Sequence, residues 1–515
     1  MIKKKEKDWF KIKRYPHIGL PLKDIDRYKW IEEYVTSPQK IVRHSFLPFI
    51  HKPALVRKFR KKYNPDNGLI EIEHIDGKKK TRFDAEKKRD LYYACHLDSL
   101  IFSYYSFLLS KKYEVKIKEN DLYDVVNAYR SIPVYPESGS SPNKCNIDFA
   151  NDVFKYILQY KEKDFAVIAY DISSFFDNLD HKLLRDVWSD VLNTQKLPLD
   201  HFNVFKNITR FSYVDIHDIF EEFKNRIFTR GINKFGKPLE ISRKIIKRVR
   251  YLRNQNAIAF CTKAEFLKVK GKLIKTNKFE KKEDGSYKKR DFGIPQGSPI
   301  SSVLANIYLL HFDIAINNFI HDKGGIYRRY SDDMVVVCPL NIKEQISQLV
   351  YEEIEKYKLV IQSKKTQLFV FRRDGPKLTC GQEFNEQMNW NKNFVYLGFE
   401  FDGENVFLKS SSLSGYYRKM KRSVLRSKHF ANRIFKKNKG EIFKKRLYKK
   451  FSYKGAKRIR KNIWSAKDNK FIKSDSYNWG NFLSYAYKAS NIMVANKIKQ
   501  QTKRHWNILN KLIKN

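Results

Sequence analysis

The sequence is poor in cysteine and has no long apolar segment. Its five cysteines among 515 residues lie far apart and form no C-x-x-C pair, which argues against a zinc ribbon or a disulfide framework and fits a reducing compartment. No stretch approaches the ~18 apolar residues of a membrane span, and the basic N-terminus lacks the apolar run of a signal peptide. We therefore expect a cytoplasmic protein without a membrane partner.

Acidic residues are scarce, above all near the C-terminus. The chain has 104 Lys and Arg against 56 Asp and Glu, and residues 409–515 hold 31 basic residues but only 3 acidic ones. Such an excess on one segment is self-repulsive and indicates a polyanionic partner, usually nucleic acid. With 42% hydrophobic residues the chain can bury sizeable cores, and its length suggests about three domains.

Two apolar segments end or turn at aspartates. Residues 165–170 form a β-prone run that ends at Asp171, and residues 326–338 are typical of a β-hairpin with Asp332 and Asp333 at its turn. A charge at a buried strand end is costly, but a carboxylate cluster is tolerable there if it binds a divalent metal such as Mg²⁺. A solvated hairpin turn is the alternative interpretation of Asp332 and Asp333.

A loop with two glycines and two prolines, residues 293–302, precedes an amphipathic helix expected from residue 303 to about residue 319. Gln296 in this loop can present a flat amide to a nucleotide or a template base. An ordinary strand-to-helix connection is the alternative. Helices interleaved with antiparallel strands predict an α+β core.

Three motifs, in this order, strongly resemble the palm of reverse transcriptases. They are Ala169-Tyr-Asp171-Ile-Ser-Ser-Phe-Phe176-Asp-Asn-Leu-Asp-His181, Gly293-Ile-Pro-Gln-Gly-Ser-Pro-Ile-Ser and Tyr330-Ser-Asp332-Asp333. Two weaker elements, Ser363-Lys-Lys365-Thr366 and Tyr396-Leu-Gly398-Phe399, look like the family's lysine motif and primer-grip turn. The resemblance implies a right-hand polymerase of fingers, palm and thumb with an antiparallel palm sheet.

The resemblance also implies roles for the matching residues. Asp171, Asp332 and Asp333 would be the catalytic carboxylates and, with Ile172, would hold two Mg²⁺ ions, Mn²⁺ being the alternative ion. Phe176 matches the bulky residue that blocks a ribose 2′-hydroxyl, which favours deoxynucleotides.

Further residues are candidates for contacts with the nucleotide. Gln296 and Gly297 would lie under the incoming nucleotide, and Lys365 would help to protonate the pyrophosphate. Upstream, Tyr129-Arg130-Ser131-Ile132-Pro133 resembles the fingers motif of bacterial reverse transcriptases outside the retroviral lineage, so Arg130 and Lys144 are candidates for gripping the triphosphate. Lys365, Arg130 and Lys144 are equally compatible with ordinary surface positions.

The expected organisation has three parts. A helical N-terminal extension covers residues 1–125, and fingers and palm cover residues 126–408. Within the palm, an insertion at about 200–290 would hold helices and a basic hairpin near Asp284-Gly285. Residues 409–515 would form a basic, all-helical thumb or RNA-binding region. Its candidate nucleic-acid-binding residues are Lys444, Lys445, Arg446, Lys457 and Arg458.

The implied function is that of an RNA-directed DNA polymerase. Its partners would be an RNA template, nascent DNA and deoxynucleoside triphosphates. A homo-oligomer is compatible with the sequence. The chain shows neither the clustered carboxylates of a ribonuclease H site after residue 408 nor a His/Cys cluster for an HNH endonuclease. A reverse transcriptase without these additional catalytic sites resembles the bacterial defence-associated and abortive-infection group. Members of that group commonly act against phage with a companion noncoding RNA. A group II intron-type maturase without endonuclease and a non-catalytic RNA-binding scaffold are the alternatives.

Overall fold

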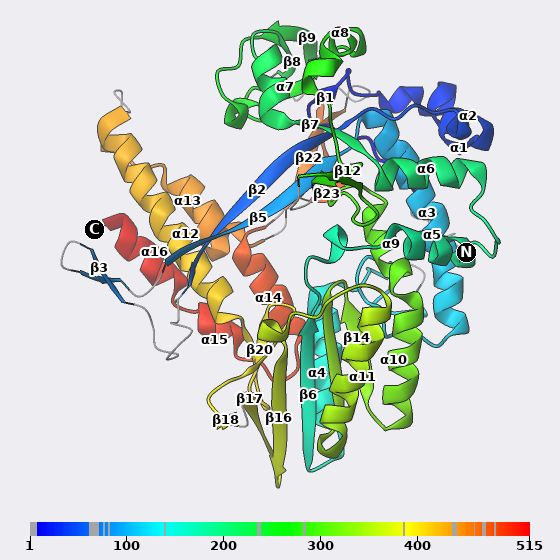
Figure 1. Ribbon diagram of the computed structural model, residues 1–515. Coiled ribbons are helices and arrows are strands. Elements are labelled where there is room, and N and C mark those ends of the chain that lie inside the picture. Colours follow the sequence, from blue (N-terminus) through cyan, green and yellow to red (C-terminus); the bar gives the residue numbers. More distant parts are fainter. Residues whose placement is uncertain are drawn as a thin grey trace.

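The fold is organised around a six-stranded antiparallel sheet with the strand order β14-β15-β6-β16-β17-β18 (Figure 1). The computed structural model describes residues 8–60, 72–75, 78–80, 83–138, 141–233, 238–281, 285–384, 387–434, 440–457, 459–465, 470–477 and 480–514. The strands of this palm sheet are β6 (Asp164–Asp171), β14 (Ile326–Tyr330), β15 (Asp333–Pro339), β16 (Gln367–Asp374), β17 (Lys377–Phe384) and β18 (Gln387–Asn389). The mixture of helices and antiparallel strands expected from the sequence is present.

The central strand β6 is buried on both faces and separates two cores. Ala166 and Ile168 contribute to one core, whereas Phe165 and Val167 contribute to the other. Successive side chains of a strand point to opposite faces, so a continuous apolar run requires cover on both sides. The predicted strand before Asp171 therefore lies at the centre of the sheet rather than at its edge.

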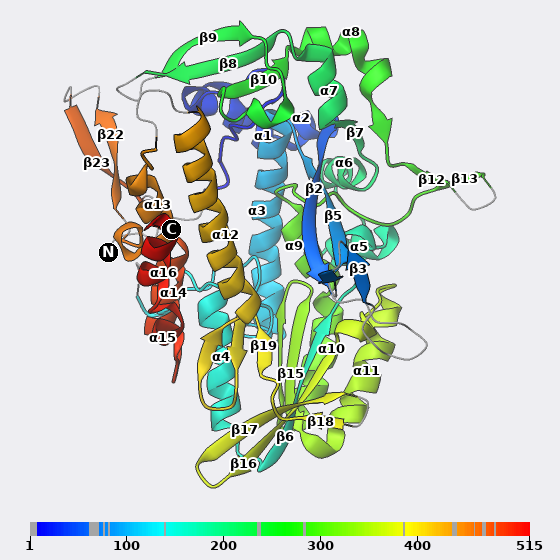
Figure 2. The same cartoon turned by 90° about the vertical axis from the view of Figure 1, so that its left-hand side faces the viewer.

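Helices cover the first face of the sheet (Figures 1 and 2). They are α3 (His96–Glu119), α5 (His181–Val191), α6 (Leu199–Thr209), α9 (Ser301–Tyr308), α10 (Leu310–Asp322) and α11 (Lys343–Lys356). The helix expected after the Gly/Pro loop is therefore present, but it is divided into α9 and α10. The chain bends by 47° between these two helices.

The second face is covered by α4, a small three-stranded sheet and two helices of the C-terminal region. These elements are α4 (Asn146–Gln159), β19 (Phe394–Tyr396), β20 (Phe399–Phe401), β21 (Val406–Leu408), α14 (Phe482–Ile492) and α15 (Ile498–Thr502). Phe154 of α4 stacks on Phe401 with ring centroids 5.1 Å apart, and Ala486 and Ala489 of α14 enter the same core. The C-terminal region thus shares a core with the palm.

The N-terminal region contains a long β-ribbon, so the expectation of a helical extension is wrong in this part. Its elements are β1 (His17–Ile18), α1 (Glu32–Thr36), α2 (Pro38–Val42), β2 (Phe49–Arg60), β3 (Glu73–Ile75), β4 (Lys78–Lys80) and β5 (Phe83–Tyr93). Basic residues interrupt the apolar pattern of β2 and β5, so that neither a helical nor a strand period stands out. Strands β3 and β4 pair antiparallel, and the two residues between them lie outside the described residues.

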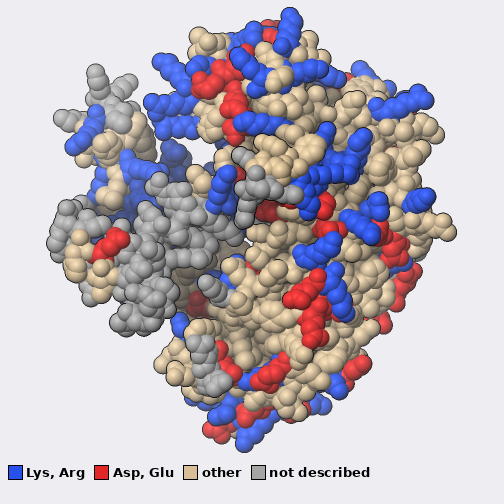
Figure 3. All heavy atoms as spheres, in the orientation of Figure 1, with Lys and Arg blue, Asp and Glu red and all other residues tan. Residues whose placement is uncertain are grey.

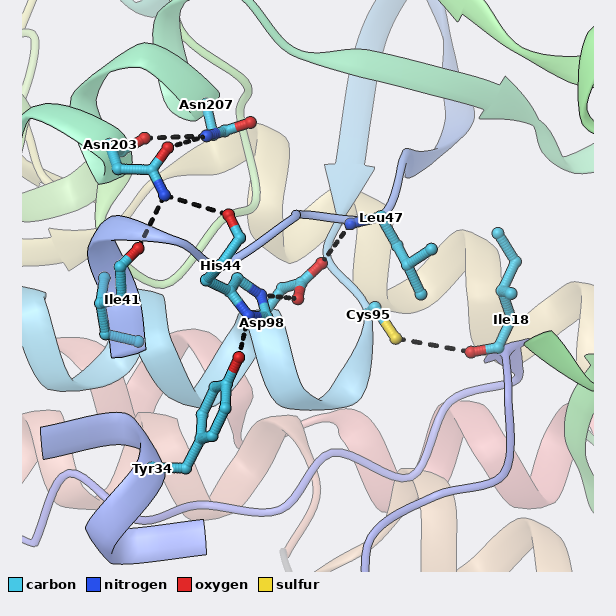
Figure 4. Close-up of polar contacts among 9 residues, drawn as sticks. All are labelled: Ile18, Tyr34, Ile41, His44, Leu47, Cys95, Asp98, Asn203 and Asn207. Atoms are coloured by element: carbon cyan, nitrogen blue, oxygen red, sulfur yellow. Dashed lines mark hydrogen bonds and ion pairs between the residues drawn. The ribbon is translucent and has the colours of Figure 1, made fainter. Parts of the chain in front are cut away.

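Buried polar contacts tie the segment before β2 to the palm helices (Figure 4). The Tyr34 hydroxyl lies 2.9 Å from His44 Nδ1, and His44 Nε2 lies 2.9 Å from Asp98 Oδ1 on α3. The other carboxylate oxygen of Asp98 accepts the Leu47 N–H at 2.9 Å. Asn203 on α6 donates its amide to two backbone carbonyls of the same segment. These contacts fix the point at which the chain enters β2.

The insertion is a mixed α/β unit rather than a set of helices, which corrects the sequence interpretation. It contains β7 (Ser212–Asp215), α7 (Ile216–Phe223), β8 (Ile227–Ile232), β9 (Pro238–Lys244), β10 (Ala257–Cys261), α8 (Lys263–Leu273), β11 (Lys275–Thr276), β12 (Phe279–Lys281) and β13 (Tyr287–Lys289). Strands β8, β9 and β10 form a sheet with β1 of the N-terminal segment. A local sequence pattern does not reveal this pairing with the distant β1. The expected basic hairpin is present as the pair β12–β13.

The C-terminal region is mostly helical, but it is not all-helical as expected. Besides α14 and α15 it contains α12 (Ser410–His429), α13 (Lys444–Phe451), α16 (His505–Lys514) and an antiparallel hairpin of β22 (Arg460–Ser465) and β23 (Lys470–Tyr477). The hairpin forms where β-prone Ile463-Trp464 and Phe471-Ile472 interrupt the basic sequence. A small core of its own includes Met420, Leu447 and Leu509.

No single helix within the described ranges is long and apolar enough to cross a membrane. The bent pair α9–α10 meets the length and composition test when its two helices are taken together. All five cysteines carry free thiols.

Candidate active site

The two strands that carry the sequence-predicted carboxylates are neighbours in the palm sheet. β6 and β15 pair in a register that sets Asp171 opposite Asp333. Residues directly opposite each other on adjacent antiparallel strands have Cβ atoms about 4.5–5.5 Å apart. A register slip of one residue would turn Asp171 to the other face of the sheet. The register therefore brings together two carboxylates that are far apart in the sequence.

Asp332 stands in the two-residue turn between β14 and β15. Tyr330 and Asp333 pair as the last residues of the two strands, which leaves Ser331 and Asp332 to form the turn. Ser331 has a φ of +63°, the left-handed conformation that tight hairpins require. The Asp332 carbonyl accepts the N–H of Ile172 at 3.2 Å. This bond ties the turn to the end of β6.

A fully buried ion pair lies behind the turn. Arg329 on β14 and Asp313 on α10 are both 0% exposed, and they form two hydrogen bonds of 2.7 and 2.5 Å. The third nitrogen of Arg329, Nη1, donates to the Ser331 carbonyl at 3.2 Å and to Asn306 Oδ1 on α9 at 3.3 Å. The Tyr327 hydroxyl donates to Asp313 at 2.9 Å. The turn of Ser331 and Asp332 is thus held against α9 and α10 by a closed polar network.

Negative charge is crowded at the strand ends. Burial among the neighbouring elements raises the pKa of Asp333 to about 6, and repulsion from Asp332 and Asp171 adds to the rise, although the side chain still reaches solvent. Lys365 lies beside these groups, with its Nζ 2.5 Å from Asp171 Oδ1, and together with Lys409 it opposes the rise. The site therefore favours an additional positive charge.

The donor atoms fit a hard divalent cation. Asp171, Asp332 and Asp333 offer carboxylate oxygens and Ile172 offers a backbone carbonyl, which are the donors that Mg²⁺ prefers. In the part of the chain that the structure describes, no group of three His, Cys, Asp or Glu side chains is gathered closely enough to hold a metal ion. The assignment of these four residues as ligands stays a prediction.

Phe176 lies in a short 3₁₀ turn (Phe175–Asp177) that follows β6. Its half-buried ring packs against the palm core, with its centroid 5.7 Å from that of Phe175. The N–H of Ile294 donates to the Phe176 carbonyl at 2.9 Å. The structure thus brings Phe176 next to the Gly/Pro loop, while its role in sugar selection stays a prediction.

The Gly/Pro loop lies against strand β5 of the ribbon. The N–H of Tyr92 donates to the Gln296 carbonyl at 2.8 Å. Gly297 has a φ of +114°, and a Cβ there would lie 2.8 Å from the Tyr92 carbonyl oxygen. Only glycine combines this backbone conformation with this close approach. The loop is therefore docked on the ribbon, and the roles of Gln296 and Gly297 in nucleotide binding stay predictions.

Arg130 is not available to a triphosphate, contrary to the sequence interpretation. Its side chain is 2% exposed. The guanidinium donates to both carboxylate oxygens of Glu114, at 2.8 and 2.7 Å, and to two backbone carbonyls, both at 2.6 Å. Since these bonds occupy four of about five N–H donors, Arg130 is a structural residue. Lys144 pairs with Asp152 at 2.8 Å, and its contact with a triphosphate stays a prediction.

The turn that resembles the primer grip is a two-residue hairpin turn between β19 and β20. Leu397 and Gly398 both have positive φ angles, +44° and +92°, as the tight turns of hairpins require. Asn146 on α4 donates its amide to the Leu397 carbonyl at 3.2 Å and to the Tyr485 hydroxyl on α14 at 2.9 Å. The turn is thus supported from the palm and from the C-terminal region.

The sequence-predicted nucleic-acid-binding residues lie on the C-terminal region. Lys444, Lys445 and Arg446 are exposed on α13, and Lys457 is exposed in the following loop. Arg458 lies outside the described residues. On the face shown in Figure 3, blue side chains are frequent over the upper half of the molecule, whereas red ones are more frequent over its lower right. Contact of these residues with nucleic acid stays a prediction.

Sequence reasoning missed the network of Arg329, Asp313 and Asn306. Two adjacent arginines, Arg328 and Arg329, follow Tyr327 in β14, and the sequence does not show that Arg329 is the fully buried one. An arginine on the buried face of a strand needs a buried acid. Which acid supplies it depends on the packing of α10, and no sequence motif marks that.

Part of the chain matches a known protein family. Residues 201–401 match the family model described as reverse transcriptase (RNA-dependent DNA polymerase). Similar solved structures include a telomerase from Candida albicans in complex with a TWJ fragment of telomeric RNA (14% identity, TM-score 0.33, covering 94% of this chain and 65% of that chain). Another is an apo telomerase from Candida tropicalis truncated from its C-terminal domain (11% identity, TM-score 0.32, covering 68% of this chain and 55% of that chain). No curated protein matches the sequence.

This chain thus spans between 55% and 65% of the length of these two telomerases. The family match contains Gln296, Asp332 and Asp333 but begins after Asp171, which joins them through the register of β6 with β15. The match and the antiparallel sheet together indicate a right-hand polymerase fold. Residues 201–401 are therefore similar to the reverse transcriptase (RNA-dependent DNA polymerase) family.

Proposed function

We propose that this protein copies an RNA template into DNA by nucleotidyl transfer from deoxynucleoside triphosphates. The observation that carries the proposal is the register of β6 with β15, which sets Asp171 opposite Asp333 and beside the turn residue Asp332. A primer hydroxyl attacks the α-phosphate, a phosphodiester bond forms and pyrophosphate leaves. Two Mg²⁺ ions, when bound, supply the positive charge that activates the hydroxyl and stabilises the leaving group, with Mn²⁺ as the alternative.

The neighbouring side chains have complementary roles in this proposal. Asp171, Asp332 and Asp333, with the Ile172 carbonyl, would hold the metal ions. The Phe176 ring excludes a ribose 2′-hydroxyl by its bulk. Lys365, whose ammonium lies 2.5 Å from Asp171 Oδ1, donates a proton to the leaving pyrophosphate. The exposed lysines and arginines of α13 contact the RNA backbone, because each neutralised phosphate releases bound counterions.

Primer extension with the full chain tests the activity. An RNA template with a DNA primer should yield DNA from deoxynucleotides, and Asp171→Asn should abolish the product without lowering the melting temperature. Asp186→Asn, which changes an exposed carboxylate on α5, is the matched control and should retain full activity. Failure of the wild-type chain to extend any primer on RNA that it binds would refute the proposal.

For the biological role, we propose antiphage defence in the cytoplasm with a companion noncoding RNA as template. The resemblance of the motif at Tyr129-Arg130 to bacterial reverse transcriptases and the basic C-terminal region support this role. Sequencing the co-purified RNA and the DNA product tests it. A short structured RNA with a matching DNA product is expected. An intron RNA would favour the maturase alternative, and bound RNA without any DNA product would favour the scaffold.

A further inference from the structure

A large cavity lies between the N-terminal segment, the base of the β2–β5 ribbon and the insertion. Its volume is about 1390 Å³. The lining comes mainly from residues 12–24, 91–93 and 216–258, and it reaches Gly297 of the Gly/Pro loop. In Figure 1 these elements meet below the green lobe that carries β8 and β9. The cavity is thus built by the two parts of the chain whose folds the sequence interpretation did not anticipate.

The cavity is strongly basic. Six lysines and arginines line it, against a single carboxylate, that of Asp24. Within the described residues, none of the six forms an ion pair with a carboxylate, so their charges are available to a ligand. The six residues are Arg14, Lys23, Lys52, Arg230, Arg250 and Arg253.

The cavity also has aromatic walls. Tyr15, Tyr92 and Tyr93 line it, and the rings of Tyr15 and Tyr93 pack edge to face with centroids 4.7 Å apart. Cations that follow a phosphate backbone, combined with aromatic rings on which bases stack, are the features of single-strand nucleic-acid sites. The volume exceeds the roughly 300–1,000 Å³ of small-molecule pockets. A strand of several nucleotides therefore fits the cavity better than a mononucleotide does.

The cavity borders the Gly/Pro loop of the candidate active site. Tyr92 lines the cavity and, through its N–H, holds the Gln296 carbonyl at 2.8 Å. Gly297 lines the cavity and touches the Tyr92 backbone. A strand leaving the cavity at Gly297 therefore passes the Gly/Pro loop, whose residues Gln296 and Gly297 are the candidates for contact with the incoming nucleotide.

We propose that this cavity binds the unpaired template RNA that has not yet been copied and guides it past Gly297 toward the carboxylates. The inference rests on the proposed polymerase function. It assigns to the N-terminal segment and the insertion a shared task, which is to hold the template ahead of the copied position.

The test measures binding of the full chain to an RNA–DNA primer–template that has an unpaired 5′ RNA overhang, compared with the same duplex with a blunt end. In the variant Arg250→Ala/Arg253→Ala, affinity for the overhang duplex should fall about tenfold at physiological salt. The log–log salt slope should fall by about 1.4, since each single-strand phosphate contact contributes about 0.7. Affinity for the blunt duplex should not change.

The matched control is Lys268→Ala/Lys270→Ala, which removes two exposed charges from α8 of the same insertion without touching the cavity. It should leave both affinities unchanged. Equal losses in the two double variants, or an equal loss on the blunt duplex, would overturn the proposal, because either result reflects overall charge. The proposal would also be overturned if Arg250→Ala/Arg253→Ala lost the same affinity for a duplex whose unpaired overhang belongs to the DNA primer instead of the RNA template.

A failure of this inference can be told apart from a failure of the polymerase function. Asp332→Asn should retain the preference for the overhang duplex although it makes no DNA. A wild-type chain that makes DNA but shows no overhang preference refutes the cavity proposal alone. A wild-type chain that prefers the overhang duplex but never makes DNA refutes the polymerase function and, with it, the template role of the cavity.

Discussion

The palm site gathers negative charge, whereas the C-terminal region gathers positive charge. The role proposed for the palm site depends on the exact position of a few side chains, and that proposed for the C-terminal region depends on total charge. In the palm, one sheet register sets Asp171 opposite Asp333, and Asp332 lies in the adjoining turn. In residues 409–515, 31 basic residues against 3 acidic ones provide charge in excess. A single change should therefore disable the palm, whereas the C-terminal region should lose its effect in proportion to the number of charges removed.

The largest expected effect is on catalysis by Asp332→Asn. Loss of the charge of a metal ligand should reduce nucleotide incorporation by more than the ~10–100-fold that outer-shell substitutions cost. Folding should survive, because removing one of three crowded carboxylates relieves repulsion. Single-nucleotide incorporation and a melting curve measure the two effects. Undiminished synthesis by a folded variant would contradict the assignment of Asp332.

The next effect is on stability, through Arg329→Met. The substitution leaves the Asp313 carboxylate buried without its partner, which should cost about 3–5 kcal/mol of unfolding free energy. Arg328→Met, at the neighbouring position of β14, is the matched control and should cost much less. Denaturant unfolding measures both variants. The double variant Arg329→Met/Asp313→Leu should recover most of the loss, and its failure to do so would assign the effect to packing.

Phe176→Ala should change sugar selection. Removal of the ring should raise ribonucleotide use relative to deoxynucleotide use by roughly 10- to 200-fold, the range for one group in a fitted pocket. Phe176→Tyr keeps the bulk and should change selection little. Incorporation assays with both nucleotide types, alongside melting curves, check this. If the folded Ala variant rejects ribonucleotides as strongly as the wild type, Phe176 is a core residue only.

The smallest effect per residue is expected in the C-terminal region. Charge reversal of Lys444, Lys445 and Arg446 should weaken RNA binding and lower the log–log salt slope by about 0.7–0.9 for each phosphate that is no longer neutralised. Reversal of three exposed lysines on α3 and α4 is the matched control and should leave the slope unchanged. These control residues are Lys112, Lys118 and Lys155. An unchanged slope in the α13 variant would mean that RNA binds elsewhere.

The sequence predicted the palm better than the regions around it. The run before Asp171 and the hairpin at Asp332-Asp333 are local patterns, and both strand predictions are confirmed. The register that joins them depends on contacts between distant segments, so only the resemblance to a known family suggested it. The ribbon was misread because basic residues interrupt the apolar pattern of β2 and β5, and in the insertion the pairing with β1 depends on a segment that is distant in the sequence. Arg130 was misread because sequence does not show which arginine is buried.

The position of β6 between β15 and β16 also affects how the chain folds during synthesis. Among the strands of the palm sheet β6 is synthesised first, and its partner strand β15 begins only at Asp333. The edges of β6 therefore stay unpaired while about 160 further residues are synthesised. At about 5–20 residues per second this takes roughly 10–30 s. Throughout that interval a strongly apolar strand has no permanent neighbour on either edge, which invites aggregation. Helix α5, which is completed soon after β6 and packs in the same core, is suited to shield one of its faces meanwhile.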